Sequence, residues 1–294
     1  MRNLSSPIST IRLTIFGGLL FAAAVIPRAQ ADTLKVFQVL ATSTNISGPA
    51  MTIDNPITNR KPGALLIVTQ YWAGVYNPHP VGVFYDTTSA KWQIVNEDLA
   101  AMPVNARFNV RVAQPTATRT FEFIATGLNS GSDYSVINRS ATNGKPAALL
   151  LATHYINANH LFASYLPAPI GVLFNAGDKI NKWSIYNEDR SSAIATCYFV
   201  ANITKEKNVS SQTSDHMTAV GDTFYISDPV ADGNPNAVIF VTHDYGAAQE
   251  FQNHPVGVYY TGTEWAIFNE DVATFAVGET FNIEVFAGPV PPTP

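Results

Sequence analysis

A seven-residue motif, W-x-I-x-N-E-D, occurs three times in this chain of 294 residues and constrains its fold more than any other feature. The copies lie at 92–98, 183–189 and 265–271. Their tryptophans are 91 and 82 residues apart, whereas a propeller blade repeats after about 40 to 45 residues. Each repeating unit is therefore long enough to contain several strands.

Two further segments recur upstream of each copy of this motif. An H-P-x-G-V-x-Y segment precedes it at 79–85 and 254–260, and the second copy has Ala168 and Phe174 in place of the histidine and the tyrosine. An apolar run after a proline lies further upstream, at 62–69, 146–153 and 235–242. These recurring segments predict three copies at 32–114, 115–205 and 206–287, followed by a Pro-rich tail at 288–294.

The pattern within each copy predicts β-strands, because short runs rich in Val, Ile, Phe, Tyr and Thr alternate with Pro, Gly, Asn and Asp. The predicted strands of the first copy are 37–43, 51–54, 64–71, 82–85, 92–96 and 108–112. We therefore expect an all-β chain of three antiparallel modules, each with about six strands.

The apolar run is continuous in every copy, as in Ala64–Val68, whereas a strand with one wet face would alternate. Both faces of this strand should be covered. This favours three modules packed together, with approximate threefold symmetry, over three independent β-sandwiches in tandem.

Together, the two motifs resemble those of a class of secreted β-rich repeat modules that have no assigned function. The resemblance covers nearly the whole chain after the first 31 residues. It implies a β-rich fold and export, and it supplies no catalytic residues.

Residues 1–31 have the pattern of a signal peptide: Arg2 and Arg12 precede an apolar run, and a small-residue site, Ala29-Gln30-Ala31, follows it. The run from Ile15 to Ile26 is shorter than the roughly 20 residues of a membrane-spanning helix. We therefore expect a secreted, periplasmic or cell-surface protein that is not transmembrane.

Without that segment, 14 basic residues face 22 acidic ones, a net charge of −8. An acidic chain without Lys/Arg clusters is unlike proteins that bind nucleic acid through phosphate neutralisation. The single cysteine, Cys197, excludes an intramolecular disulfide. It lies in an apolar stretch, which predicts an inert buried thiol.

The W-x-I-x-N-E-D motif itself is interpreted as structural. On a strand its Trp, Ile, Asn and Asp share one face, so the Trp and Ile should enter the core while the Asn and Asp bind backbone groups of the next turn. The residues assigned this role are Trp92, Asn96, Asp98, Trp183, Asn187, Asp189, Trp265, Asn269 and Asp271. The alternative is Ca²⁺ ligation or bonding to sugar hydroxyls by the same oxygens; otherwise no cofactor is expected.

Histidine recurs at two positions, directly after the threonine that ends the apolar run and directly before the proline of H-P-x-G-V-x-Y. Only the third copy has a histidine at both. His243, His254 and Asp271 are therefore candidate ligands of a transition metal. The competing interpretation is that a histidine before a proline is a turn or packing residue.

Two loops differ in length between the copies while the frame stays constant, and the loop after the apolar strand is rich in aromatic and amide side chains. Variable loops on a rigid frame are typical of binding modules, and aromatic faces with amides suit sugar rings. The candidate ligand-binding residues are Tyr71, Trp72, Tyr76, Asn77, Tyr155, Asn157, Tyr165, Tyr245 and Gln249.

The sequence as a whole favours an exported, non-enzymatic binding or adhesion protein, multivalent for a surface glycan or another extracellular polymer. The alternatives are a structural protein of the cell surface and a polysaccharide hydrolase. No Ser/His/Asp or Cys/His signature marks a catalytic centre.

Overall fold

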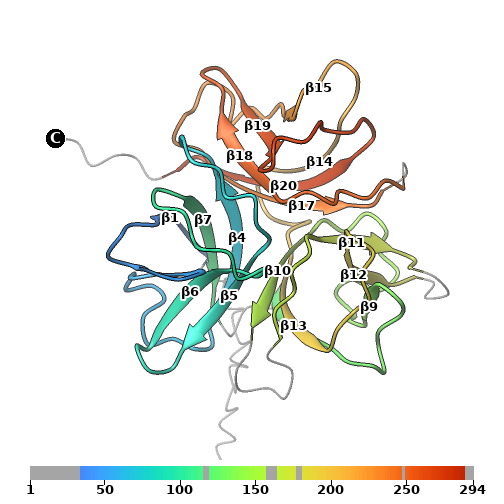
Figure 1. Ribbon diagram of the computed structural model, residues 1–294. Coiled ribbons are helices and arrows are strands. Elements are labelled where there is room, and N and C mark those ends of the chain that lie inside the picture. Colours follow the sequence, from blue (N-terminus) through green and yellow to red (C-terminus); the bar gives the residue numbers. More distant parts are fainter. Residues whose placement is uncertain (1–33, 115–118, 157–163, 177–180, 247–248, 289–294) are drawn as a thin grey trace, which may run out of the picture. The chain divides into compact units, whose positions relative to one another are not determined.

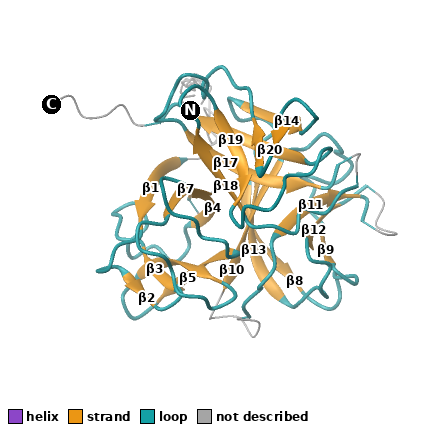
Figure 2. Cartoon of the chain, turned by 45° about the horizontal axis from the view of Figure 1, so that its top comes forward, coloured by secondary structure: helices purple, strands orange, loops and turns teal. Residues whose placement is uncertain are grey.

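A computed structural model gives the structure of residues 34–114, 119–156, 164–176, 181–246 and 249–288. Throughout these residues the chain consists of strands and loops, without a helix (Figure 2). The predicted all-β class is confirmed. Within the same ranges no helix is long and apolar enough to cross a membrane.

The first copy contributes seven strands, and all six predicted strands are among them. They are β1 (Lys35–Leu40), β2 (Ile46–Ser47), β3 (Ala50–Thr52), β4 (Leu65–Tyr71), β5 (Val81–Asp86), β6 (Lys91–Asn96) and β7 (Arg107–Ala113). The second copy contributes β8 (Thr120–Ala125), β9 (Tyr134–Ile137), β10 (Leu150–Ile156), β11 (Ile170–Phe174), β12 (Trp183–Asn187) and β13 (Thr196–Asn202). The third contributes β14 (Val209–Thr213), β15 (Ala219–Val220), β16 (Thr223–Tyr225), β17 (Val238–Asp244), β18 (Val256–Tyr260), β19 (Trp265–Asn269) and β20 (Thr280–Phe286).

Every sheet is shared between two copies (Figure 1). The sheet orders are β1-β7-β4-β18-β19-β16-β15, β2-β3-β6-β5-β10-β13-β8 and β14-β20-β17-β11-β12-β9. Strand pairs within a copy are antiparallel, as predicted, whereas the pairs that join copies, β4–β18, β10–β5 and β17–β11, are parallel. The three modules are therefore packed together in a cyclic arrangement, and the alternative of independent sandwiches is wrong.

The apolar strands β4, β10 and β17 lie where the three copies meet, and residues 65–70 of β4 are all buried, as their continuous hydrophobicity predicts. Their threonines bind across the copies. The backbone N–H of Val68 donates to Thr153 Oγ1 at 2.9 Å, that of Ala152 to Thr242 Oγ1 at 3.0 Å, and that of Val241 to Thr69 Oγ1 at 3.2 Å. These three hydrogen bonds run from copy one to copy two, from two to three and from three to one, and so form a closed ring.

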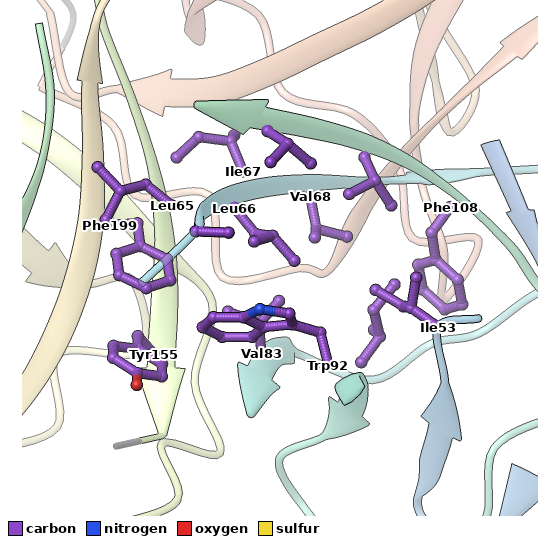
Figure 3. Packing of buried hydrophobic residues seen from close by; sticks show 14 of the residues in the cluster. Ile53, Leu65, Leu66, Ile67, Val68, Val83, Trp92, Phe108, Tyr155 and Phe199 are labelled. Atoms are coloured by element: carbon purple, nitrogen blue, oxygen red, sulfur yellow. The ribbon is translucent and has the colours of Figure 1, made fainter. Parts of the chain in front are cut away.

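Each copy has a core centred on its motif tryptophan, and the first core also takes in residues of the other two copies. Trp92 lies against Leu66 and Val83 of its own copy, and Tyr155 and Phe199 of the second copy approach it from the side (Figure 3). The rings of Trp92 and Tyr155 are 5.4 Å apart. Burial of shared apolar surface thus binds the copies to one another.

The second copy differs in the register of its last strand. His154 is opposite Tyr198, whereas the matching His243 is opposite Phe281. Tyr198 therefore takes the place of Phe281, although it is Phe199 that lies, like Phe281, ten residues after the aspartate of its motif. Phe199 instead stacks on Tyr155, with ring centroids 4.4 Å apart.

Replacing Thr153 with valine should weaken the ring of cross-copy bonds, because valine keeps the shape of threonine but leaves the buried N–H of Val68 without its acceptor. The expected loss in the free energy of unfolding is about 1 to 3 kcal/mol. Thr153→Ser retains the hydroxyl and should lose less. Urea denaturation followed by tryptophan fluorescence measures both variants, and a Thr153→Val protein as stable as the wild type would contradict the assigned bond.

Candidate functional site

The glutamate of each N-E-D motif reaches from its own copy into the next one. Glu97 accepts a hydrogen bond from Nδ1 of His154 at 2.7 Å and another from the backbone N–H of Leu166 at 2.8 Å. Glu188 makes the same pair of bonds, to His243 Nδ1 at 2.7 Å and to the N–H of Gln252 at 2.8 Å. These carboxylates therefore fasten the loop that follows the central strand of the neighbouring copy.

The third glutamate has no histidine. Glu270 accepts the backbone N–H of Asn77 at 2.9 Å, but Gln70 stands where the other copies have His154 and His243. The side chain of Asn77 binds Gln70 Oε1 at 2.8 Å and Asn96 Oδ1 at 2.9 Å. An uncharged amide network thus replaces the histidine–carboxylate pair at this boundary.

The recurring glycine of the H-P-x-G-V-x-Y segment makes room for this carboxylate. A Cβ on Gly82 would lie 2.1 Å from Glu97 Oε1, and one on Gly171 or Gly257 would lie 2.3 Å from the matching Oε1 of Glu188 or Glu270. At each of these glycines the close neighbour is therefore the glutamate side chain of the N-E-D motif.

The other motif residues have local roles. The motif tryptophans are buried, and each indole N–H donates to a backbone carbonyl, as Trp92 does to Lys61 at 3.0 Å. The asparagines donate to carbonyls of the next turn, and each aspartate accepts a backbone N–H two residues on. These are the contacts that the sequence predicts for a structural motif.

The three candidate metal ligands do not come together. His254 binds Asp271 at 2.7 Å, while His243 is held by Glu188 of the second copy. Among the described residues, no group of three or more His, Cys, Asp or Glu side chains is placed to hold a metal ion. The predicted cluster is wrong in its geometry, because the glutamate of another copy, which no local spacing reveals, takes His243.

One hydroxyl, imidazole and carboxylate lie in line, as in a nucleophilic triad. Thr196 Oγ1 is 2.6 Å from Nε2 of His154, whose Nδ1 binds Glu97. Yet Thr196 is fully buried and the other two are at most 2% exposed, so substrate cannot reach the hydroxyl. We read this group as a structural contact between copies.

A cavity of about 90 Å³ lies where the copies meet. Thr69, Thr153 and Thr242 line it together with His154 and His243. Its carboxylates, from Glu97 and Glu188, are already bonded to the neighbouring copies.

Two larger cavities lie at boundaries between copies and are rich in aromatic side chains. The first cleft, about 240 Å³, is formed by Trp72, Tyr76, Asp222, Thr223, Tyr259 and Phe268. The second cleft, about 500 Å³, is lined by Asp133, Tyr134, Leu173, Phe174, Asn175, Ala176, Tyr186, Tyr245, Gly246, Gln249 and Phe251. The first joins copies one and three, and the second joins copies two and three.

The two clefts occupy equivalent places in the repeat. Trp72 and Tyr245 each lie three residues after the threonine of the central strand, and Phe268 and Tyr186 share the position before the motif asparagine. At the remaining boundary these positions hold Ile156 and Val95. Residues 157–163 lie outside the described part of the chain.

The predicted ligand-binding residues fall into separate places. Trp72 and Tyr76 line the first cleft, and Tyr245 and Gln249 line the second. Tyr165, beside Leu166 at the boundary of copies one and two, is 48% exposed. Asn157 lies outside the described residues.

The other three predicted ligand-binding residues belong to the interior. Tyr71 packs on Trp265 with ring centroids 5.6 Å apart, Asn77 is buried in the Glu270 network, and Tyr155 stacks on Phe199. The sequence missed the strand-borne walls of the clefts, Tyr259 and Phe268 in the first and Tyr186 in the second. The signal for Phe268 and Tyr186 was an aromatic residue at the motif position that holds Val95 in the first copy.

The family comparison matches this chain three times. A model described as "Domain of unknown function (DUF7452)" covers residues 25–112, 82–196 and 176–285. The chain belongs to this family. No curated protein and no solved structure matches it. The three matches agree with the tandem copies of this DUF7452 chain, and the description assigns no chemistry to them.

Burial governs the ionisation of two acids, one at the boundary of copies three and one and the other at the boundary of copies two and three. It raises the pKa of Glu270 to about 8, which the hydrogen bond from Asn77 only partly offsets. Burial likewise raises the pKa of Glu279 to about 7, against the pull of His243. Burial opposes a charge on His243, yet Glu188 beside it raises the pKa of that imidazole overall. The boundary without a histidine therefore keeps its glutamate protonated at neutral pH.

This protonation predicts a pH dependence of stability. Folded Glu270 holds its proton up to about pH 8, whereas the unfolded chain releases it near the ordinary value of 4.5, so the free energy of unfolding should fall as pH rises between these values. Glu270→Gln mimics the protonated acid and should be more stable than the wild type by roughly 2 to 4 kcal/mol at pH 8.5, with no advantage at pH 4. Urea titrations across this range test it. The difference between the two proteins isolates Glu270 from Glu279, and a difference that does not change with pH would contradict the assignment.

The packing of glutamate on glycine predicts a second effect. Gly171→Ala would place a methyl group against Glu188 Oε1 and should lower the free energy of unfolding by about 1 to 3 kcal/mol. Gly127→Ala is the matched control, because open space surrounds that glycine, and its effect should stay within about 0.5 kcal/mol. Thermal melting compares the two, and equal melting temperatures would remove the steric explanation.

Proposed function

We propose that this chain is an exported, non-enzymatic binding protein that recognises carbohydrate of a surface polymer through the second cleft. The observation that carries the proposal is the composition of that cleft. Rings of Tyr245 and Phe251 lie beside the amides of Asn175 and Gln249 and the carboxylate of Asp133. Aromatic faces pack against the apolar face of a sugar, while amide and carboxylate groups bind its hydroxyls.

The cleft is well placed for this task. Its walls come from strands β11 and β12, which the cross-copy bond of Glu188 to His243 holds against the third copy. The loop that carries Tyr245 and Gln249 varies between copies, so side chains can change there while the frame is kept. Export after removal of residues 1–31 would bring this cleft to extracellular polymers.

A binding role is favoured over hydrolysis by the carboxylates. Among the described residues, the second cleft is lined by one acid, Asp133, and the first by one acid, Asp222. Glycoside hydrolysis uses two carboxyl groups about 5 to 9.5 Å apart. One acid beside aromatic rings supports recognition of hydroxyl groups.

A glycan array followed by titration calorimetry tests the proposal. We expect binding of at least one glycan class, weakened about tenfold or more by Tyr245→Ala and by Asp133→Asn. Tyr76→Ala in the first cleft is the matched control and should bind the same glycan as the wild type does. Absence of any glycan signal, or equal affinity in all three variants, would overturn the carbohydrate assignment. Filaments in electron micrographs without glycan binding would favour a structural role instead.

A further inference from the structure

We propose that the first cleft is a cage for a quaternary or trimethylated ammonium cation, such as the head group of choline. Four aromatic side chains and one carboxylate form the cleft, and they come from two copies: Trp72 and Tyr76 from the first, and Tyr259, Phe268 and Asp222 from the third. This ligand is distinct from the sugar assigned to the second cleft.

The four rings contact one another in a closed circuit. Trp72 lies 5.8 Å from Tyr76 and 5.8 Å from Tyr259, and Phe268 lies 5.9 Å from Tyr76 and 5.4 Å from Tyr259. The ring contacts described for these residues run around the cleft and none crosses it. Three of the four pairs meet at 69° to 89°, like adjoining walls of a box, and the fourth meets at 46°.

Such a box suits a cation with an apolar surface. The face of an aromatic ring carries negative electrostatic potential and attracts a cation within about 6 Å of its centroid. The methyl groups of a trimethylammonium ion spread its charge and weaken its hydration, so it can contact several rings. The volume of about 240 Å³ fits a compact head group, since sites for larger organic ligands measure about 300 to 1,000 Å³.

The polar residues of the cleft favour the same charge. Asp222 is the one ionisable acid among the six lining residues, and none of the six is basic. Thr223 Oγ1 donates to Asp222 Oδ1 at 3.1 Å and lies 3.3 Å from the hydroxyl of Tyr259. These contacts hold the carboxylate at the aromatic wall.

The equivalent cluster of the second cleft already has a cation of its own. The guanidinium carbon of Arg190 lies 5.2 Å above the ring centroid of Phe251, which corresponds to Tyr76. There the position of Tyr259 is Leu173, and Tyr186, Tyr245 and Phe251 contact one another directly at 4.9 to 5.7 Å. In the first copy the position of Arg190 is Leu99, and in the third it is Val272, so neither supplies a basic side chain to the first cleft.

Titration of the full chain with choline chloride, followed by calorimetry, tests the proposal. The uncharged isostere 3,3-dimethylbutan-1-ol has the same shape without the charge, and it should bind at least about tenfold more weakly than choline. Tyr259→Leu copies the second cleft and should weaken choline binding about tenfold, and Asp222→Asn should weaken it by a similar factor. Tyr245→Ala, in the second cleft, should leave choline affinity unchanged.

Melting curves confirm that each variant is folded. No binding of choline, equal binding of the uncharged isostere, or full affinity in both folded cage variants would overturn the proposal. Because the glycan test depends on Tyr245 and Asp133, either assignment can fail without the other.

Discussion

Each central strand pairs along its length with a strand of its own copy, but on its other side the parallel strand of another copy pairs only with its last residues. The structure depends on how the remaining backbone groups of that side are satisfied. Parallel pairing of β4 with β18 involves only Gln70 and Tyr71, so the N–H of Val68 further back has no strand to bind. A buried N–H without an acceptor is costly. Thr153 of the next copy supplies the acceptor, and the same exchange repeats around the three copies. Each copy therefore completes the hydrogen bonding of another.

The same dependence explains why two separate motifs recur together. The glutamate of W-x-I-x-N-E-D folds back over the glycine of H-P-x-G-V-x-Y, and it also accepts bonds from the next copy. A larger residue at Gly171 would displace Glu188, and loss of Glu188 would leave the N–H of Gln252 and the imidazole of His243 without their shared acceptor. The two motifs thus supply the two sides of a single contact at the boundary between copies.

Much of the fold could be predicted because its signals are local. The alternation of residues, the turn residues and the continuous apolar run at 64–68 predict strands and a buried centre without knowledge of other copies. The sharing of sheets could not be predicted, since pairing of β4 with β18 joins residues 187 positions apart, and no local pattern marks it. The metal hypothesis failed for the same reason, because the partner of His243 comes from another copy. Loop aromatics such as Trp72 were found, whereas Phe268 was hidden inside a motif interpreted as core.

The boundary contacts also explain why the clefts differ while the frame does not. Glu97, Glu188 and Glu270 occupy one position and keep one role, because a change would disturb two copies at once. The residue two places earlier in the chain is Val95, Tyr186 or Phe268, and it is buried in every copy. Tyr186 and Phe268 line the two aromatic clefts. This position holds an aliphatic side chain in one copy and an aromatic one in the other two, within the same frame. Three copies of one frame can therefore present different clefts, which is why equivalent places in this chain hold an open aromatic box at one boundary and a cluster with its own arginine at another.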